Sequence, residues 1–227
     1  MVRVPLSPTA DLSRSPNCLG EVVQTSTTEY VAQCFSPDEL KFPSMPALGS
    51  WVRVADGDSD RDIFGVICHA TTVPVDSMHR ARPLGLTPEQ LQAQHPQIFA
   101  MLQTEFRVAI VGFEVEAHRD VGLPPSYYLP PSPPQLHQAV VSCTPAEVGR
   151  FCQSLRFLRT LLGVQGIPSD ELVAAAVRQS YGAIASLPAT SERDGRQWLV
   201  QVGRELAIQL KDDYDRLRAI LQKIELY

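Results

Sequence analysis

The first half of the chain alternates apolar runs with turn-forming residues, a pattern typical of a sheet made from short strands. The runs are dense in β-branched and aromatic residues, which favour strands. Aspartate and glycine between residues 56 and 62 supply a turn, so the two runs beside them indicate a β-hairpin. The expected strands lie within residues 21–34, 51–54, 63–68, 107–115 and 138–143. Together they predict a small closed β-barrel over residues 18–143, which the last of these strands closes.

One helix is inserted in this barrel sequence. Thr87, Pro88 and Gln90 form a capping box with proline at the first helical position, and apolar residues follow at helical spacing. We therefore expect a helix over about residues 88–103, which Pro96 would kink.

The last third of the chain has the apolar period of helices. A second capping box at Thr144 starts a helix that stops at Gly163, and Ser169 caps a third helix. The last helix, over about residues 197–226, repeats apolar residues at three- and four-residue steps, as a heptad does. This stripe could pack on the chain's own helices, which is the commoner use, or on a partner helix. Residues 144–227 are thus expected to form a helical region.

Two other segments have the composition of connectors. Residues 1–17 are rich in Ser, Pro, Thr and Arg and predict a flexible leader. Residues 123–134 contain six prolines in twelve positions, which favours extended polyproline geometry and a semi-rigid spacer. The expected fold class is α+β, an N-terminal closed barrel followed by a C-terminal helical region.

Charge and composition narrow the choice of partners. The 227-residue chain has a net charge of −5, and residues 1–140 hold nine Lys or Arg against fifteen Asp or Glu. Such an acidic barrel has no large positive field to attract a phosphate backbone, so direct nucleic-acid binding is disfavoured. No stretch has the apolar core of a signal peptide or of a membrane span. The five cysteines form no C-x-x-C pair. These features predict a soluble, cytoplasmic protein.

No pattern in the sequence predicts a catalytic, cofactor-binding or metal-binding residue. There is no G-x-x-x-x-G-K-[ST] loop and no G-x-G-x-x-G fingerprint, so nucleotide hydrolysis is not expected. The alternating aspartates of residues 56–62 resemble the start of a calcium loop, but the sixth position is not glycine and the twelfth is Ile67 rather than glutamate. A solvated hairpin tip is expected instead. Cys152 and His137 could be imagined as nucleophile and base, but a structural cysteine is the favoured role.

Several short motifs along the strands carry a resemblance. They are GEVV at 20–23, TTEYVAQC at 27–34, LGSWVRV at 48–54, IFGV at 63–66, TEF at 104–106 and YLPP at 128–131. On these motifs the chain resembles the HAS-barrel family, named for the barrel shared by the HerA translocase and the rotary ATP synthase, over about residues 18–160. It is similar to stand-alone cyanobacterial members. The resemblance implies a six-stranded or similar closed barrel used for subunit contacts. In HerA-like translocases this barrel helps to assemble the hexamer and meets a nuclease, but here no motor domain follows and no catalytic residue carries over.

These observations predict a non-enzymatic module for protein–protein interaction or assembly, with a protein partner or a homo-oligomer. Aromatic and arginine side chains dominate interface energetics. The candidate contact residues are therefore Tyr127, Tyr128, Arg204, Tyr214 and Arg218. Two alternatives stay open: an accessory factor in DNA processing that acts with a separately encoded ATPase or nuclease, and a small hydrolase or metal enzyme.

Overall fold

Six antiparallel strands close into a barrel in the order β1-β2-β5-β4-β3-β6. The computed structural model describes residues 17–35, 45–56, 60–75, 83–188 and 190–224. The strands are β1 (Cys18–Thr25), β2 (Glu29–Cys34), β3 (Trp51–Asp56), β4 (Arg61–Pro74), β5 (Leu102–Val115) and β6 (Ala139–Ser142). The predicted barrel is confirmed, and β6 closes it by pairing with both β1 and β3.

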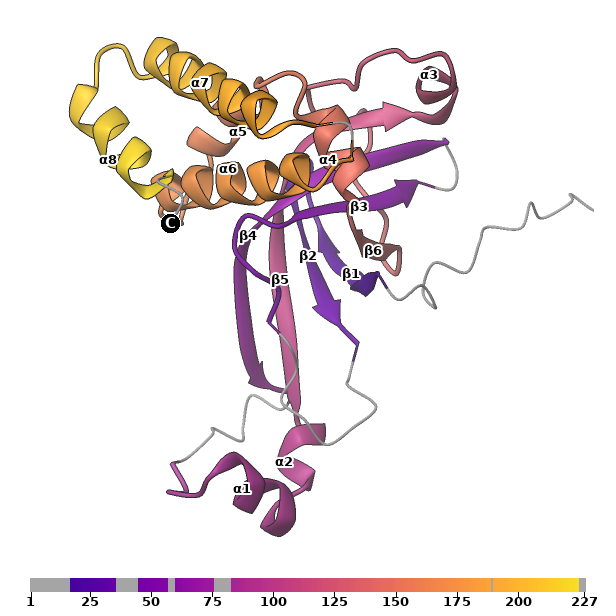
Figure 1. The fold of residues 1–227 in the computed structure, drawn as a ribbon. Helices are drawn as coiled ribbons and strands as arrows, with labels where there is room; N and C mark the ends of the chain where they lie inside the picture. Colours follow the sequence, from indigo (N-terminus) through magenta and orange to yellow (C-terminus); the bar gives the residue numbers. More distant parts are fainter. Residues whose placement is uncertain (1–16, 36–44, 57–59, 76–82, 189, 225–227) are drawn as a thin grey trace, which may run out of the picture.

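The helices fall into two groups. Three short ones belong to the barrel sequence: α1 (Pro88–Gln94), α2 (Gln97–Ala100) and α3 (Glu116–Asp120). Five follow the barrel: α4 (Pro145–Phe151), α5 (Phe157–Leu162), α6 (Ser169–Ala185), α7 (Glu192–Gln209) and α8 (Tyr214–Ile224). The C-terminal group gathers against one end and side of the barrel, whereas α1 and α2 lie at the far end of the long β4–β5 hairpin (Figure 1). The predicted α+β class is therefore confirmed. None of the described helices is both long enough and apolar enough to cross a membrane.

Much of β4 and β5 is buried on both sides, because one set of side chains fills the barrel and the other meets the helices. The interior set includes Tyr30, Phe106 and Ile110. The outer set, which includes Trp51 and Phe64, belongs to the same apolar cluster as helices α4 to α8. The barrel and the C-terminal helices thus share a core.

An aromatic group joins the barrel to the helices. The Trp51 ring centroid lies 5.3 Å from that of Phe151 and 5.1 Å from that of Phe157, within the range of favourable aromatic pairs. Its indole Nε1 donates to Ser180 Oγ of α6 at 2.9 Å. Helix α6 comes so close to Gly49 (φ 81°) that a Cβ there would lie 2.5 Å from the α6 backbone. Glycine is therefore required at this position both by its dihedral angle and by its neighbour.

The proline-rich segment runs along β5. Ser126 exchanges two backbone hydrogen bonds with Phe113, at 3.0 and 2.8 Å, and Pro125, Pro130 and Pro134 are buried. A Cβ on Gly112 would lie 2.2 Å from the Ser126 carbonyl oxygen. The segment is thus fixed to the barrel surface along this stretch, where a spacer was predicted.

Three helix predictions need correction. The helix expected over residues 88–103 ends at Gln94, because Pro96 interrupts it, and residues 102 and 103 already belong to β5. The helix expected from Thr144 to Gly163 is divided into α4 and α5. Ser169 is the first residue of α6 and provides no side-chain cap.

The last helix, expected to be continuous over residues 197–226, is two helices. It breaks between Gln209 and Tyr214, where Asp213 Oδ1 accepts a hydrogen bond from the Arg216 backbone N–H at 3.1 Å. The break lets α8 turn back onto α6. Of the predicted apolar stripe, Val202, Leu206, Leu217 and Ile224 are buried within this chain. Leu221 of the stripe is exposed, and its neighbour Ile220 is the buried residue instead. Of the predicted leader, residues 1–16 lie outside the described residues.

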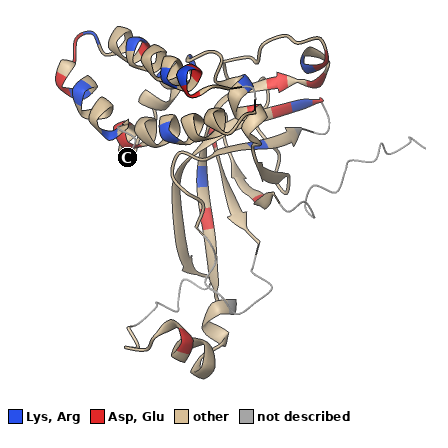
Figure 2. Ribbon diagram, viewed as in Figure 1, with Lys and Arg blue, Asp and Glu red and all other residues tan. Residues whose placement is uncertain are grey.

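Positively and negatively charged residues gather at the end of the barrel near α3 and α4 (Figure 2), where their side chains form a network. This charged network consists of Arg53, Asp62, Glu114, Arg119, Glu147 and Arg150. The Glu114 side chain is fully buried, and its Oε2 accepts from Arg119 Nε at 3.1 Å and from Arg150. Asp62 is paired with Arg53 and Arg119, so this aspartate is not part of the solvated hairpin tip that was expected. The network ties three strands to α3 and α4.

Candidate functional site

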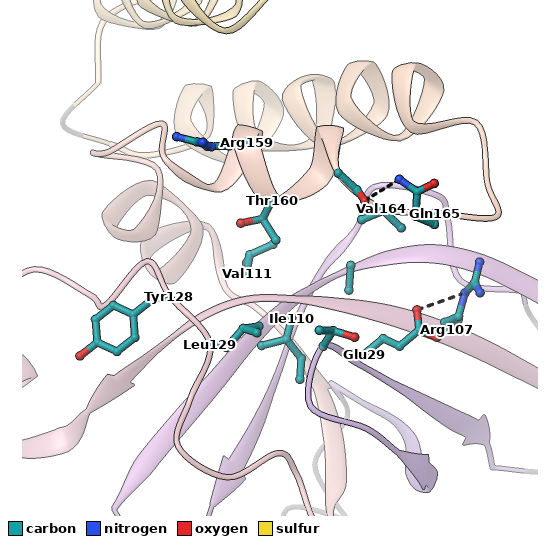
Figure 3. A pocket seen from close by; sticks show the side chains of 13 residues that line it. Glu29, Arg107, Ile110, Val111, Tyr128, Leu129, Arg159, Thr160, Val164 and Gln165 are labelled. Carbon is teal, nitrogen blue, oxygen red and sulfur yellow. Dashed lines mark hydrogen bonds and ion pairs between the residues drawn. The ribbon is translucent and has the colours of Figure 1, made fainter.

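A groove with a volume of about 900 Å³ separates the outer face of β5 from helix α5. We name it the β5–α5 groove. Figure 3 shows β5 along one side and α5 along the other, with Tyr128 and Arg159 towards one end and Arg107 and Gln165 towards the other. Its lining residues are Thr28, Glu29, Arg107, Ala109, Ile110, Val111, Tyr128, Leu129, Arg159, Thr160, Gly163, Val164 and Gln165.

One wall of the groove is the outer face of β5, and the other wall is helix α5. In β5, Arg107, Ala109 and Val111 alternate with residues of the barrel interior, so they share the outer face. Helix α5 presents Thr160 towards Val111 (Figure 3). The middle of the groove is accordingly apolar, and its ends are polar.

Arg107 occupies one end and has an unused hydrogen-bond donor. Its Nε is buried but has no hydrogen-bond partner among the described residues, and its ion pair with Glu29 Oε2 is long, at 3.8 Å. A buried donor without an acceptor costs free energy, on the order of 1–3 kcal/mol. An acceptor that entered the groove at this end would recover that cost.

The other end carries a second arginine and an exposed aromatic ring. Arg159 is exposed, and no ion pair holds it within the part of the chain that the structure describes. Tyr128 is 66% exposed and is held by an edge-to-face contact with Phe113, with centroids 5.3 Å apart. Leu129 beside it is also exposed. This end therefore offers a positive charge next to an apolar surface.

A smaller hollow of about 350 Å³ continues past Arg107 along β4 and β5. It shares Arg107 with the β5–α5 groove and adds His69, Thr71 and Glu105. The two hollows together form a path along the outer face of β5. Such a path suits an extended ligand better than a compact one.

The predicted contact residues lie in two separate places. Tyr128 lines the β5–α5 groove. Its neighbour Tyr127 is half-buried, and its hydroxyl donates to the Phe151 carbonyl oxygen at 2.9 Å, with the two rings 5.0 Å apart. Burial raises the pKa of the Tyr127 hydroxyl. Tyr127 therefore anchors the proline-rich segment rather than offering a free surface.

Arg204, Tyr214 and Arg218 lie on the exposed sides of α7 and α8, away from the residues that line the groove. Tyr214 is 71% exposed. Sequence reasoning missed Arg107, Arg159 and Glu29. The signal available for Arg107 was a charged residue directly before the apolar run of residues 108–113 in β5.

Cys68 and Cys152 are buried thiols, and the other three cysteines are partly buried. Burial raises the pKa of Cys152 to about 12 and that of Cys34 to about 11, so both are protonated at neutral pH and are weak nucleophiles. Cys152 Sγ lies 3.5 Å from Ser180 Oγ in the core, whereas His137 is exposed with its Nδ1 3.5 Å from Glu21 Oε2. The imagined pair of Cys152 and His137 is therefore not assembled.

The aspartates of residues 56–62 do not gather around one point in the described residues. Asp60 is exposed, Asp62 is in the charged network, and Asp58 lies outside the described residues. Over the described ranges, no group of three or more His, Cys, Asp or Glu side chains could hold a metal ion.

Comparison with known proteins adds no family. A scan against models of protein families finds no match, and a search of curated proteins finds no matching protein either.

Proposed function

We propose that this chain is a protein-interaction module and that its β5–α5 groove binds an extended segment of a partner protein that carries acidic and apolar side chains. The observation that carries the proposal is the arrangement of Arg107 and Arg159 at opposite ends of an apolar groove, with the Arg107 Nε buried and 3.8 Å from Glu29 Oε2, too far for a hydrogen bond. A carboxylate is the acceptor that a guanidinium binds best.

Two features favour a peptide over a compact ligand. The path continues beyond Arg107 into the smaller hollow, so it is longer than one pocket. Exposed Tyr128 and Leu129 supply the aromatic and aliphatic contacts that contribute most at interfaces. The chain as a whole is acidic. An acidic segment is therefore attracted to the two arginines of the groove more strongly than to the rest of the protein surface.

The HAS-barrel resemblance is part of this proposal. The closed six-stranded barrel is the kind of fold that the resemblance implies, and subunit contact is the use that the family makes of it. We propose that the barrel serves here as a rigid support on which α5 and the proline-rich segment build the groove.

The test is selection of peptides by the full chain. A displayed library of random peptides is panned against the protein, and enriched peptides are synthesised for fluorescence anisotropy. We expect enrichment of Asp or Glu next to apolar residues. Arg107→Gln and Arg159→Gln should each weaken binding by about tenfold or more, since a hydrogen bond to a charged group is worth about 1.5–3 kcal/mol.

Arg204→Gln is the matched control, because it removes the same charge from an exposed site on α7. It should leave the affinity unchanged. Enriched peptides without acidic residues, or binding that the Arg107 and Arg159 variants do not alter, would contradict the proposal.

A further inference from the structure

The long hairpin of β4 and β5 has an open edge. β4 pairs with β3 only as far as Val66, and two hydrogen bonds of 2.9 Å, from Gly49 N to Ile67 O and from Ile67 N to Ser50 O, continue the contact by one residue. From Cys68 to Pro74 the outer edge of β4 has no backbone hydrogen bond to any residue that the structure describes. In Figure 1 this lower half of β4 lies at the margin of the sheet.

The direction of the free groups follows from the strand register. Val75 N donates to Met101 O at 2.8 Å, towards β5. Alternate residues of a strand direct their N–H and C=O groups to opposite sides. The N–H and C=O groups of Ala70 and Thr72 therefore point to the open edge. Pro74 shares that direction, which suits a residue without an N–H.

Between the bulge at residues 67–69 and Pro74, this edge has no charged side chain that would oppose pairing. Edge strands commonly carry charged side chains that oppose contact with another strand, but residues 70–75 contain none. The ends of the edge are apolar and exposed: Val75 is 59% exposed at one end, and Leu48 is 41% exposed near the other. An uncharged edge with apolar ends is complementary to itself.

We propose that the partner of this edge is a second copy of the chain, paired antiparallel through β4 with a two-fold axis at Thr71. In this register the N–H and C=O groups of Ala70 in each copy form hydrogen bonds with the C=O and N–H groups of Thr72 in the other copy. Every free group of both residues is therefore paired. An axis at Thr72 would leave the Ala70 carbonyl group unpaired. The register with its axis at Thr71 is therefore favoured.

The same axis accounts for the rest of the edge. It brings Val75 of each copy close to Leu48 of the other copy, because these two residues lie at opposite ends of the edge. The apolar ends therefore meet in a symmetric contact. It also places the two Thr71 side chains directly opposite each other, a favourable cross-strand pair. Pro74 ends the pairing, and because a two-fold contact uses the same edge of both copies, it closes as a dimer and does not extend into a fibre.

The test is sedimentation equilibrium of the full chain over about a hundredfold range of concentration, because a dimer of this kind dissociates on dilution. We expect the wild type to be in a monomer–dimer equilibrium. Thr71→Lys and Thr71→Glu should each weaken the dimer by at least about tenfold, since like charges then face each other. Mixing the two variants should restore a dimer.

Two further variants distinguish this edge from other contacts. Ala70→Pro removes an outward N–H and should weaken the dimer, while leaving the ladder with β5 intact. Thr27→Lys adds the same charge at an exposed turn and should leave the dimer unchanged. Thermal melts followed by circular dichroism verify that each variant is folded. A monomeric wild type at every concentration, or a dimer that neither Thr71→Lys nor Ala70→Pro weakens, would overturn the proposal.

Discussion

Glu114 is the side chain whose removal should disturb the charged network most. It is fully buried, and its Oε2 serves both Arg119 and Arg150. Glu114→Ala would remove the buried carboxylate with which the guanidinium groups of Arg119 and Arg150 are paired. Breaking a buried ion pair on one side costs about 3–5 kcal/mol. Arg119 is 32% and Arg150 28% exposed, so water screens part of this cost, and we expect the free energy of unfolding to fall by about 3 kcal/mol.

The assay is urea unfolding followed by circular dichroism. For a chain of this size the slope is near 3 kcal/mol per molar urea, so the midpoint should fall by about 1 M. Glu192→Gln is the control, because Glu192 and Arg196 form an ion pair with both side chains about three-quarters exposed, and such pairs contribute little. If Glu114→Ala lowers the midpoint no more than Glu192→Gln does, the network does not fasten α3 and α4 to the barrel.

Two further outcomes are expected. Gly49→Ala should lower the free energy of unfolding by at least about 2 kcal/mol more than Gly122→Ala does. Both glycines have positive φ, but only at Gly49 would a Cβ meet the α6 backbone. Equal losses of stability in urea unfolding would contradict this. Burial raises the pKa of the Cys152 thiol from 9.0 to about 12, so its contribution to stability is complete below pH 9 and is lost as the pH rises towards 12. Cys152→Ala should therefore make the alkaline fall in stability shallower, by up to about 1.4 kcal/mol per pH unit, and unchanged slopes between about pH 8 and pH 11 would contradict it.

The barrel could be predicted because its strands are specified locally. Dense β-branched runs and a turn at residues 56–62 give strand positions without knowledge of what covers them. Both capping boxes, at Thr87 and Thr144, are formed as the sequence indicated. Local hydrogen-bond chemistry of this kind depends on only a few neighbouring residues.

The helix break near Asp213 could not be predicted in the same way. The segment from Leu210 to Asp213 has no glycine or proline, and its apolar spacing is that of one continuous helix. Contacts with distant residues decide the outcome: Arg216 pairs with Asp170, and Lys223 with Glu171, both on α6. A stripe of apolar residues indicates that one face of a helix is buried, but it does not indicate which element covers that face.

The β5–α5 groove was missed for a related reason. Arg107 and Arg159 are about fifty residues apart in the chain, and only the packing of α5 beside β5 places them at one groove. Tyr128 was identified because it is aromatic and lies in a loop, a property of the residue itself. The function of a pair of arginines depends on their separation in space, which the sequence pattern does not contain.

The two proposed contacts meet at Thr71, which lines the smaller hollow and lies on the proposed dimer axis, whereas Arg107 and Ala70 each belong to one contact alone. The groove lies on the outer face of β5, and the dimer contact uses the backbone edge of β4. Ala70→Pro should weaken the dimer without changing peptide affinity, and Arg107→Gln should do the reverse. If either variant changes both measurements, the two surfaces are coupled through the hairpin, and dimer formation would then regulate access of the peptide to the groove.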